Sequence, residues 1–326
     1  MTAGVFESAR VAGLSGETLR ALRAAGLDTG DVVRVVRAAL EEDFRYGADL
    51  TSAATVAGRT VTAEVVAREP GVLSGVPVAL AVLDLLTEYQ GGTGRTALAA
   101  DRTLAADRTL AGTVLVTDGA RIGAGDAVLR VAGPAVAVLG AERTMLNFLT
   151  HLSGVATATR AWADAIAGTG AVIRDTRKTT PGLRALEKYA VRCGGGENHR
   201  MGLGDAALVK DNHVAAAGGV AAAVAAVRAA APCGMVVEVE CDSVAQLLEA
   251  LAAGARFVLL DNMSVPSLRA AVAVAREYPG VRLEASGGLQ LSNAREVAET
   301  GVDYLAVGSL THSSRALDLG LDAVAL

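Results

Sequence analysis

The second half of the chain repeats one pattern of apolar and polar positions. Short, β-branched apolar runs alternate with longer stretches that have the spacing of helices. Six of the apolar runs are expected to be strands, at 171–175, 206–210, 235–240, 256–261, 281–286 and 304–309. Helices are expected between them, at 214–231, 243–253, 265–278 and 292–299, after a long helix over about 142–167. Strands that alternate with helices form parallel βαβ units, so the pattern predicts an α/β barrel or an open relative of one.

The first half has a more mixed pattern. Residues 31–43 have the spacing of an amphipathic helix, and residues 59–69 alternate like a strand. Short strands joined by Asp-Gly and Gly turns are predicted over 112–134. The hexapeptide "AADRTL" occurs twice, at 99–104 and 105–110, and we interpret it as a duplicated surface loop whose role the sequence leaves open.

These patterns predict a chain of class α/β with two domains. We expect an N-terminal α/β domain over 1–141 and an α/β barrel over 142–311. The last segment, 312–326, alternates leucines with polar or small residues, which indicates a strand that returns to the sheet of the first domain.

Composition narrows the classes of function. Of 326 residues, 52% are hydrophobic but only 3% aromatic, so Ala, Val, Leu and Gly must build the core. The net charge of −5 argues against a nucleic-acid-binding protein, for which a basic surface is expected. The three cysteines include no C-x-x-C pair, so we expect reduced, mostly buried thiols and a cytoplasmic protein.

Membrane insertion and export are not expected. The N-terminus lacks a basic segment followed by an apolar core, which an export signal would have. The longest apolar run, Val214 to Val227, has 14 residues, which is too short to span a bilayer, and we expect a buried helix there.

Lysine is rare in this chain. Only three of the 30 basic residues are lysines, so 30 − 3 = 27 are arginines. Lys188 is expected on a solvated helix face, where chance explains it. Lys178 and Lys210 follow predicted strands, and an ammonium group binds phosphate as a compact point charge in a way that a guanidinium does not. We therefore expect functional roles for these two lysines.

Polar residues and glycines follow every predicted strand of the second half. In parallel α/β barrels the chemistry takes place at the carboxyl ends of the strands, so these residues are expected to form one site. The strand ends contain Asp175 to Lys178, Lys210 to His213, Glu240, Asp261 with Asn262, Ser286 to Gly288, and Gly308 with Ser309.

Three kinds of residue occur at this rim. Glycines after the last two strands allow backbone N–H groups to approach a phosphate, although ordinary turns also use glycine. Glu240 and Asp261 could hold ribose hydroxyls, Mg²⁺ or a developing positive charge, or could form a buried ion pair with an arginine. The cations imply a ligand with several negative charges, or two anions, and they are Arg177, Lys178, His199, Arg200 and Lys210. The role of His213 stays open.

Longer motifs carry a resemblance to a known family. They run from "EEDFRYGADLTS" (41–52), "REPGVLSGV" (68–76) and "AERTMLNFLTHLSGVAT" (141–157) through "DTRKTTPGLRALEKYAVRCGGGENHRMGL" (175–203). They continue in "LVKDNH", "VEVECDS", "VLLDNMS", "EASGG" and "YLAVGSLTHS". With these motifs the chain resembles the quinolinate phosphoribosyltransferases along nearly its whole length, and the tandem "AADRTL" is the main departure.

The resemblance implies a fold and a reaction. The fold would be an N-terminal α/β sandwich joined to an open, TIM-like α/β barrel of seven elements, the type II phosphoribosyltransferase fold. The reaction would convert quinolinate and phosphoribosyl pyrophosphate (PRPP), with Mg²⁺, to nicotinate mononucleotide, CO₂ and pyrophosphate, in the de novo synthesis of NAD.

The resemblance also implies roles for individual residues. Quinolinate would be bound by Arg177, His199, Arg200 and Lys210, and by Arg143 from the neighbouring subunit of a homodimer. Lys178 would contact PRPP and take part in catalysis. Glu240 and Asp261 would face the ribose and the metal, and the 5′-phosphate would lie against Ser286, Gly287, Gly288 and Gly308.

Three other readings of the site stay open at this point. The first is a related enzyme that acts on another anionic base, although nicotinate, with one carboxylate, would need fewer cations. The second is a regulatory barrel that binds a sugar phosphate without turnover, which two carboxylates at the mouth disfavour. The third is a Schiff-base aldolase that uses Lys210, for which the other cations would have no purpose.

Overall fold

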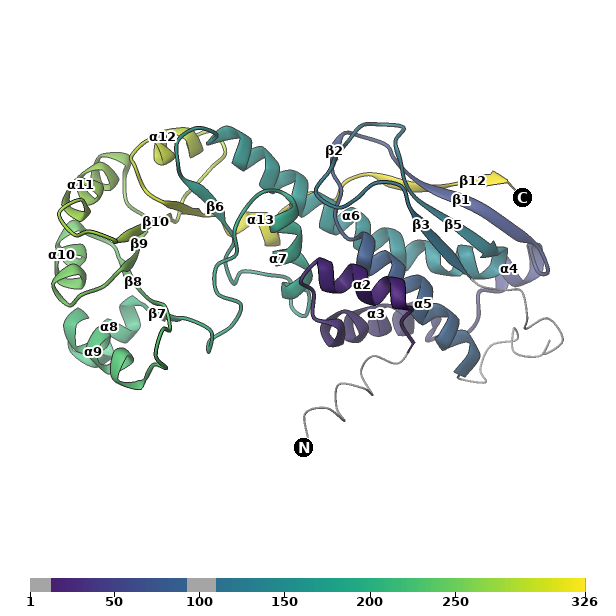
Figure 1. Ribbon diagram of the computed structural model, residues 1–326, viewed down its shortest axis with the longest axis horizontal. Helices are drawn as coiled ribbons and strands as arrows, with labels where there is room; N and C mark the ends of the chain where they lie inside the picture. The colour runs from purple at the N-terminus through teal and green to yellow at the C-terminus, as the bar shows by residue number, and fades with distance from the viewer. Residues whose placement is uncertain (1–12, 93–109, 326) are drawn as a thin grey trace. The chain divides into compact units, whose positions relative to one another are not determined.

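The computed structural model describes residues 13–92 and 110–325 (Figure 1). The chain forms two compact units. The first holds the chain up to Thr157 together with 181–194 and the segment from Ser314, and the second holds 158–180 and 195–313. The boundary predicted at residue 142 falls inside helix α6 (Ala135–Ala165), because the helical pattern continues through it.

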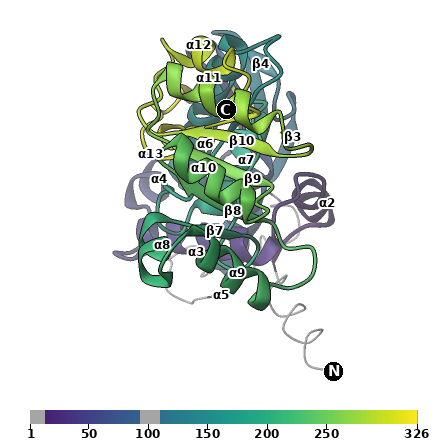
Figure 2. The same cartoon turned by 90° about the vertical axis from the view of Figure 1, so that its left-hand side faces the viewer.

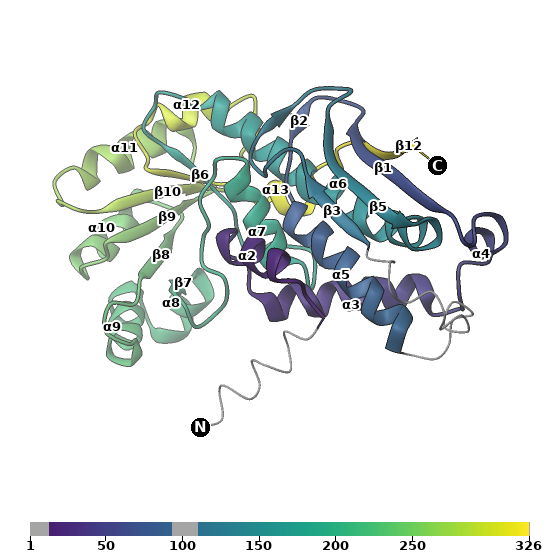
Figure 3. The same ribbon diagram turned by 45° about the vertical axis from the view of Figure 1, so that its right-hand side comes forward.

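The first unit contains a four-stranded antiparallel sheet in the order β12-β1-β5-β3. Its strands are β1 (Thr60–Ala67), β3 (Ala111–Val114), β5 (Ala127–Pro134) and β12 (Leu319–Ala325). Alternate residues of β1 are buried, which gives the sheet one face toward the core. The last strand lies beside β1, as the alternating leucines led us to expect (Figure 3).

Helices and one small ribbon complete this unit. The helices are α2 (Gly16–Ala24), α3 (Thr29–Phe44), α4 (Leu50–Thr55), α5 (Val76–Gly92), α7 (Arg184–Cys193) and the first part of α6. The ribbon pairs β2 (Gly71–Val72) with β4 (Arg121–Ile122). Three helices begin where a side-chain oxygen accepts a backbone N–H of the first turn, namely Ser15 before α2, Asp28 before α3 and Asp49 before α4.

The second unit contains six parallel strands in the order β6-β11-β10-β9-β8-β7. They are β6 (Val172–Arg174), β7 (Ala207–Val209), β8 (Val237–Cys241), β9 (Phe257–Asp261), β10 (Arg282–Ser286) and β11 (Tyr304–Ala306). All six predicted strands are therefore confirmed. Within residues 158–313, where the family resemblance implied seven elements, six strands form the sheet. Its two edge strands, β6 and β7, are not paired with each other, so the barrel is open.

Helices follow the strands and cover the sheet (Figure 2). They are α8 (Asp211–Ala217), α9 (Val220–Ala230), α10 (Val244–Ala252), α11 (Val265–Ala275), α12 (Ala294–Ala298) and α13 (Ser309–His312). The regular alternation of strand and helix directs the carboxyl ends of all six strands to one side.

The apolar run Val214 to Val227 is not the single buried helix that its composition predicted. It breaks between α8 and α9 because Gly218 and Gly219 have φ values of 86° and 140°. Many of its small alanines are exposed. Among the described residues no single helix has the length and apolar composition to cross a membrane, and α8 with α9, bent by 94°, has them only as a pair.

Two further predictions about burial were wrong. Lys188 is fully buried, not solvated, because every residue of α7 from Leu186 to Val191 is buried and the helix has no solvated face at this level. The thiols are free, but only Cys241 is buried, whereas Cys193 is partly exposed and Cys233 is exposed. The tandem "AADRTL" lies, apart from Leu110, outside the described residues.

Gly154 allows the segment before β12 to cross helix α6 at close range. A Cβ atom at this position would collide with the carbonyl oxygen of Arg315 and lie 3.0 Å from the Cα of Ala316. The same crossing is held by a hydrogen bond that the backbone N–H of Leu317 donates to the carbonyl of Thr150, at 2.9 Å. Backbone atoms cannot move aside as a flexible side chain can, so only glycine fits.

We expect Gly154→Ala to lower the free energy of unfolding by about 1–3 kcal/mol, because the added methyl group forces the two backbones apart. Urea-induced unfolding of the purified variant measures this. The control is Gly16→Ala in the first turn of α2, where the new methyl group would meet only the flexible end of Arg20, at 3.4 Å. Equal stability of the two variants would show that the crossing tolerates a side chain.

Candidate active site

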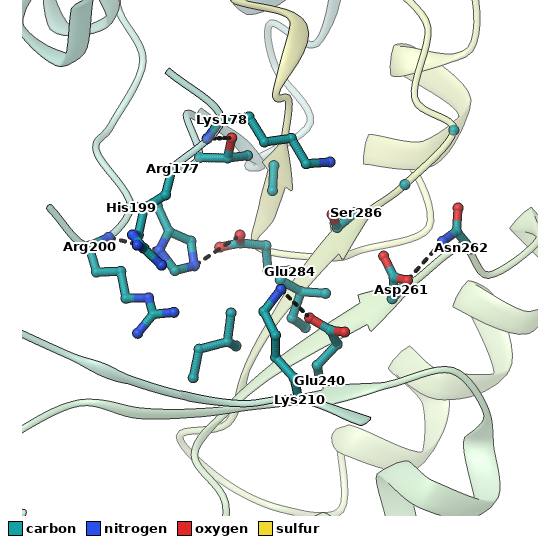
Figure 4. Close-up of a pocket in the computed structure, with 16 residues that line it drawn as sticks. Arg177, Lys178, His199, Arg200, Lys210, Glu240, Asp261, Asn262, Glu284 and Ser286 are labelled. Carbon is teal, nitrogen blue, oxygen red and sulfur yellow. Dashed lines mark hydrogen bonds and ion pairs between the residues drawn. The ribbon is translucent and has the colours of Figure 1, made fainter. Parts of the chain in front are cut away.

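The carboxyl ends of the parallel strands surround a cavity of about 550 Å³ in the second unit (Figure 4). Its walls contain Thr176, Arg177, Lys178, His199, Arg200, Leu208, Lys210, Glu240, Leu259, Asp261, Asn262, Glu284, Ser286, Gly287, Gly288 and Ala306. The structure thus brings together ten of the twelve predicted site residues. The other two, Arg143 and Gly308, are not among the lining residues.

The rim of the cavity depends on an unusual backbone at two neighbouring strand ends. Asn262, after β9, has a φ of 53°, and its N–H donates a hydrogen bond to the carbonyl of Ser286 at 2.8 Å. Gly287, after β10, has a φ of 83°, and a Cβ there would overlap the Asn262 side chain. Only glycine suits position 287, because it tolerates the positive φ and has no Cβ to overlap Asn262. The backbone at 287 therefore has no side chain between it and the cavity.

Two guanidinium groups crowd one side of the cavity. Arg177 is half-buried, and its buried Nε has no hydrogen-bond partner among the described residues. Arg200 donates from Nη1 to the carbonyl of Ala206 at 3.1 Å. Burial first, and then the positive charge of Arg177, lower the pKa of Arg200. Neighbouring cations that are partly removed from water favour an anion between them.

Lys210 and the two rim carboxylates occupy another side. The Nζ of Lys210 lies 3.7 Å from Oε2 of Glu240, and the Lys210 side chain is 47% exposed, so the ammonium remains accessible. Burial raises the pKa of Glu240, Lys210 opposes this shift, and the negative charge of Asp261 adds to it. Asp261 itself accepts a hydrogen bond from Nδ2 of Asn262 at 2.7 Å.

Glu240 and Asp261 have the donor chemistry that Mg²⁺ prefers. Both are carboxylates at the mouth of one cavity, and each feels the negative charge of the other, which a divalent cation would relieve. Two protein ligands are too few for a closed metal cage, but Mg²⁺ commonly keeps waters and binds phosphate oxygens of the substrate. The pair therefore fits a cation that arrives with an anionic substrate.

Hydrogen bonds of its backbone N–H and carbonyl groups fix the position of Lys178 after the end of β6. Its N–H donates to Oγ1 of Thr176 at 3.0 Å, and its carbonyl accepts from Oγ1 of Thr311 at 2.8 Å. A Cβ on Gly308 would lie 3.0 Å from Cδ of Lys178, so this glycine leaves room for the lysine side chain. Although Gly308 does not line the cavity, it lies directly beside a residue that does.

A second layer of charged residues lies one alternation deeper in the strands, and the sequence analysis missed it. Arg174, Glu238 and Glu284 each precede a predicted rim residue by two positions, so they face the same side of the sheet. Arg174 pairs through Nη1 with Oε2 of Glu284, and its guanidinium lies 4.6 Å from the ring centroid of Tyr304. The sequence did contain a signal for this layer, because each of these charged residues stands inside an otherwise apolar predicted strand.

His199 connects this layer to the rim. Its Nδ1 accepts the backbone N–H of Arg200 at 2.7 Å, so the ring carries its proton on Nε2. Nε2 lies 2.8 Å from Oε2 of Glu238 and 3.6 Å from Oε1 of Glu284. The imidazole therefore faces two buried acids and at the same time positions the backbone of Arg200.

The two buried acids influence each other. Burial first, and then the negative charge of Glu238, raise the pKa of Glu284, while Arg174 and His199 oppose this shift. The ligand atoms of His199, Glu238 and Glu284 lie within 4.8 Å of one another, a spacing at which they could hold a metal ion. Because the guanidinium of Arg174 already pairs with Glu284, we interpret the group as a charge network instead of a metal centre.

The remaining predicted residues have other surroundings. Arg143 is exposed on the part of α6 that belongs to the first unit. His213, whose role the sequence left open, accepts the backbone N–H of Lys210 at Nδ1, at 3.0 Å, and so helps to cap α8.

Comparison with known proteins identifies one family over nearly the whole chain. Family models described as the N-terminal and C-terminal domains of quinolinate phosphoribosyl transferase match residues 49–153 and 155–322. The chain is 55% identical over 291 residues to the nicotinate-nucleotide pyrophosphorylase [carboxylating] of Mycobacterium leprae, with 88% of this chain and 95% of that protein covered. It is 38% identical to the probable enzyme of the same name from Bacillus subtilis, with 86% and 89% covered.

Solved structures give the same result. The nicotinate-nucleotide pyrophosphorylase from Francisella tularensis is 37% identical and superposes with a TM-score of 0.81, with 91% of this chain and 97% of that chain covered. The likeness therefore extends over both units and includes the strands that carry the cavity.

Proposed function

The chain belongs to the quinolinate phosphoribosyltransferase family, and from this premise we propose that it transfers the phosphoribosyl group of PRPP to quinolinate with loss of CO₂. The products are nicotinate mononucleotide and pyrophosphate, on the route to NAD. The observation that carries the proposal is the pair of crowded guanidinium groups, Arg177 and Arg200, in a cavity that also holds two lysines and two rim carboxylates.

Quinolinate is assigned to the cationic side of the cavity. Its two carboxylates meet Arg177, Arg200 and Lys210, and the unpartnered Nε of Arg177 is available for one of them. His199 lies beside this group and holds Arg200 through its ring Nδ1. Burial and then the positive charge of Arg177 lower the pKa of Arg200, and a dianion between these cations relieves that repulsion.

PRPP is assigned to the rim. Lys178 faces the pyrophosphate, and the 5′-phosphate lies against the backbone of Ser286, Gly287, Gly288 and Gly308. Glu240 and Asp261 face the ribose, where positive charge develops at C1 as pyrophosphate departs. Glu240 and Asp261 would hold Mg²⁺, which would neutralise part of the pyrophosphate charge.

The chemistry then needs orientation and charge more than a protein nucleophile. The ring nitrogen of quinolinate attacks C1 of the ribose while the bond to pyrophosphate breaks, and the two rim carboxylates stabilise the cationic carbon. The nitrogen becomes a pyridinium, whose positive charge stabilises the electron pair left on the adjacent carbon C2 when its carboxylate leaves as CO₂. Arg177, Arg200 and Lys210 hold the ring in place through both steps.

The assembly is part of the proposal. Arg143 is exposed on α6 and lines no part of the cavity, so we assign it to the quinolinate site of the partner subunit in a homodimer. The rival readings fit the cavity less well. A regulatory sugar-phosphate binder would gain nothing from Glu240 and Asp261, and the Lys210 ammonium is paired with Glu240, whereas a Schiff-base lysine must lose its proton.

The direct test supplies purified protein with quinolinate, PRPP and Mg²⁺ and measures CO₂ and mononucleotide. We expect both products from quinolinate. Nicotinate should bind more weakly than quinolinate by about 1–3 kcal/mol, because one buried cation is left without a partner. Calorimetry that gives equal affinities for the two ligands would contradict the assignment of a dicarboxylate.

Lys178→Arg tests whether the rim needs a compact ammonium group. The larger, planar cation keeps the charge but replaces the compact ammonium assigned to the pyrophosphate, so we expect turnover to fall by about 100-fold or more with little change in folding. Steady-state kinetics and thermal unfolding measure the two effects. Arg269→Lys, the reverse exchange on the exposed face of α11, is the control and should be silent. Near-normal turnover by Lys178→Arg would remove the lysine from the mechanism.

Arg143→Ala mixed with Lys178→Ala tests the shared site. Each variant alone should be inactive. After subunit exchange about half of the dimers are mixed, and in each of these one site carries both changes and the other carries neither, so roughly a quarter of the wild-type activity should return. If each site is built from a single chain, no activity returns, and Arg143 has a structural role instead.

A further inference from the structure

Glu284 lies in the wall of the cavity but has no part in the steps described so far. Its side chain is 1% exposed, and it comes from the middle of β10, two residues before Ser286. Oε2 pairs with Nη1 of Arg174. Oε1 is buried and has no hydrogen-bond partner among the described residues, and it lies 3.6 Å from Nε2 of His199. A buried carboxyl oxygen without a partner calls for a functional explanation.

The proposed reaction leaves one requirement unmet. When the carboxylate at C2 leaves as CO₂, the electron pair of the broken carbon–carbon bond stays on C2. The product carries hydrogen at this position, so one proton must reach carbon in every turnover. The donor must face the ring, must be protonated near neutral pH, and must be able to release the proton again.

The other groups that line the cavity are less suited to this step. Arg177 and Arg200 do not deprotonate in proteins. Lys210 is paired with Glu240, and Lys178 is assigned to the pyrophosphate. His199 has its Nδ1 occupied by the backbone of Arg200, and its Nε2 faces Glu238 and Glu284. Glu284 is therefore the remaining candidate for the proton donor. It lines the cavity one layer below the rim residues.

The surroundings of Glu284 favour an exchangeable proton. Burial and the adjacent negative charge of Glu238 raise its pKa, while Arg174 and His199 limit the shift. The carboxyl can therefore hold a proton before the reaction. After the proton has left, the new carboxylate is stabilised by the guanidinium of Arg174.

We propose that Glu284 is the acid that protonates C2 of the pyridine ring as the C2 carboxylate leaves, so that proton transfer accompanies cleavage of the carbon–carbon bond. The bond between C2 and the carboxyl carbon breaks, CO₂ departs, and the electron pair on C2 takes the proton of the Glu284 carboxyl group. Glu284 becomes a carboxylate beside Arg174 and regains a proton from water after the product leaves. No oxidant or further reactant is needed. This inference rests on the proposed function.

The test follows both leaving groups in a single turnover, with quinolinate labelled in the C2 carboxylate. In the wild type, CO₂ should follow pyrophosphate one for one. In Glu284→Gln, which keeps the shape but not the acid, pyrophosphate release should stay within about threefold, while CO₂ release should slow by roughly tenfold or more. A mononucleotide that retains both carboxylates should accumulate, and mass spectrometry detects it. Glu284→Asp, which keeps an acid, should restore part of the CO₂ release.

Glu240→Gln is the matched control, because it removes a carboxylate from the same cavity but acts at the ribose. It should slow pyrophosphate and CO₂ release together. The wild type provides a test that does not depend on the folding of a variant. As the pH rises from about 6 to 9 and Glu284 ionises, CO₂ release should fall behind pyrophosphate release.

The outcomes separate the two proposals. If Glu284→Gln folds and binds quinolinate but releases both products in step, Glu284 is not the proton donor, and the proposed function stands. If that variant does not fold, the pH series on the wild type replaces it. Equal rates of CO₂ and pyrophosphate release up to pH 9 in the wild type would overturn the inference. If the wild type releases neither CO₂ nor pyrophosphate, the proposed function itself fails.

Discussion

A cation that is partly withdrawn from water needs a negative partner, and this constraint governs the cavity of the second unit. Arg177 and Arg200 both line the cavity and are partly buried, and burial together with the positive charge of Arg177 lowers the pKa of Arg200. Such an arrangement costs free energy until an anion enters, and that cost is a measure of how strongly an anion is favoured. The fold tolerates it because a rigid parallel sheet holds the strand ends in place.

The same sheet separates two kinds of chemistry. Alternate residues of each strand face the cavity, so a rim residue and a deeper residue come from the same strand, as Glu240 and Glu238 do in β8. At the rim, charges are half-exposed and suited to phosphates, ribose and a divalent cation. In the deeper layer, burial and the negative charge of Glu238 raise the pKa of Glu284, and the neighbouring Arg174 opposes this shift. A reaction with a glycosyl step and a decarboxylation can use both levels.

The sequence predicted the strands and the rim well, because both follow from local patterns. Apolar runs of limited length mark strands, and the first polar residue after each run marks its carboxyl end. Features that depend on packing between distant segments of the chain were predicted poorly from the sequence. The burial of Lys188 results from the surroundings of α7, and the pairing of Arg174 with Glu284 joins residues 110 positions apart. The break at Gly218 was visible as a Gly-Gly pair, but the apolar run around it suggested one continuous helix.

In the proposed complex, the crowded cations hold a dicarboxylate with its ring above the deeper acids. The most direct measurement is a crystal structure of the protein with quinolinate bound. We expect both carboxylates of quinolinate in contact with Arg177, Arg200 and Lys210, and the C2 side of the ring toward Glu284. A quinolinate whose carboxylates point to the phosphate rim at Gly287, or whose C2 side faces away from Glu284, would contradict it.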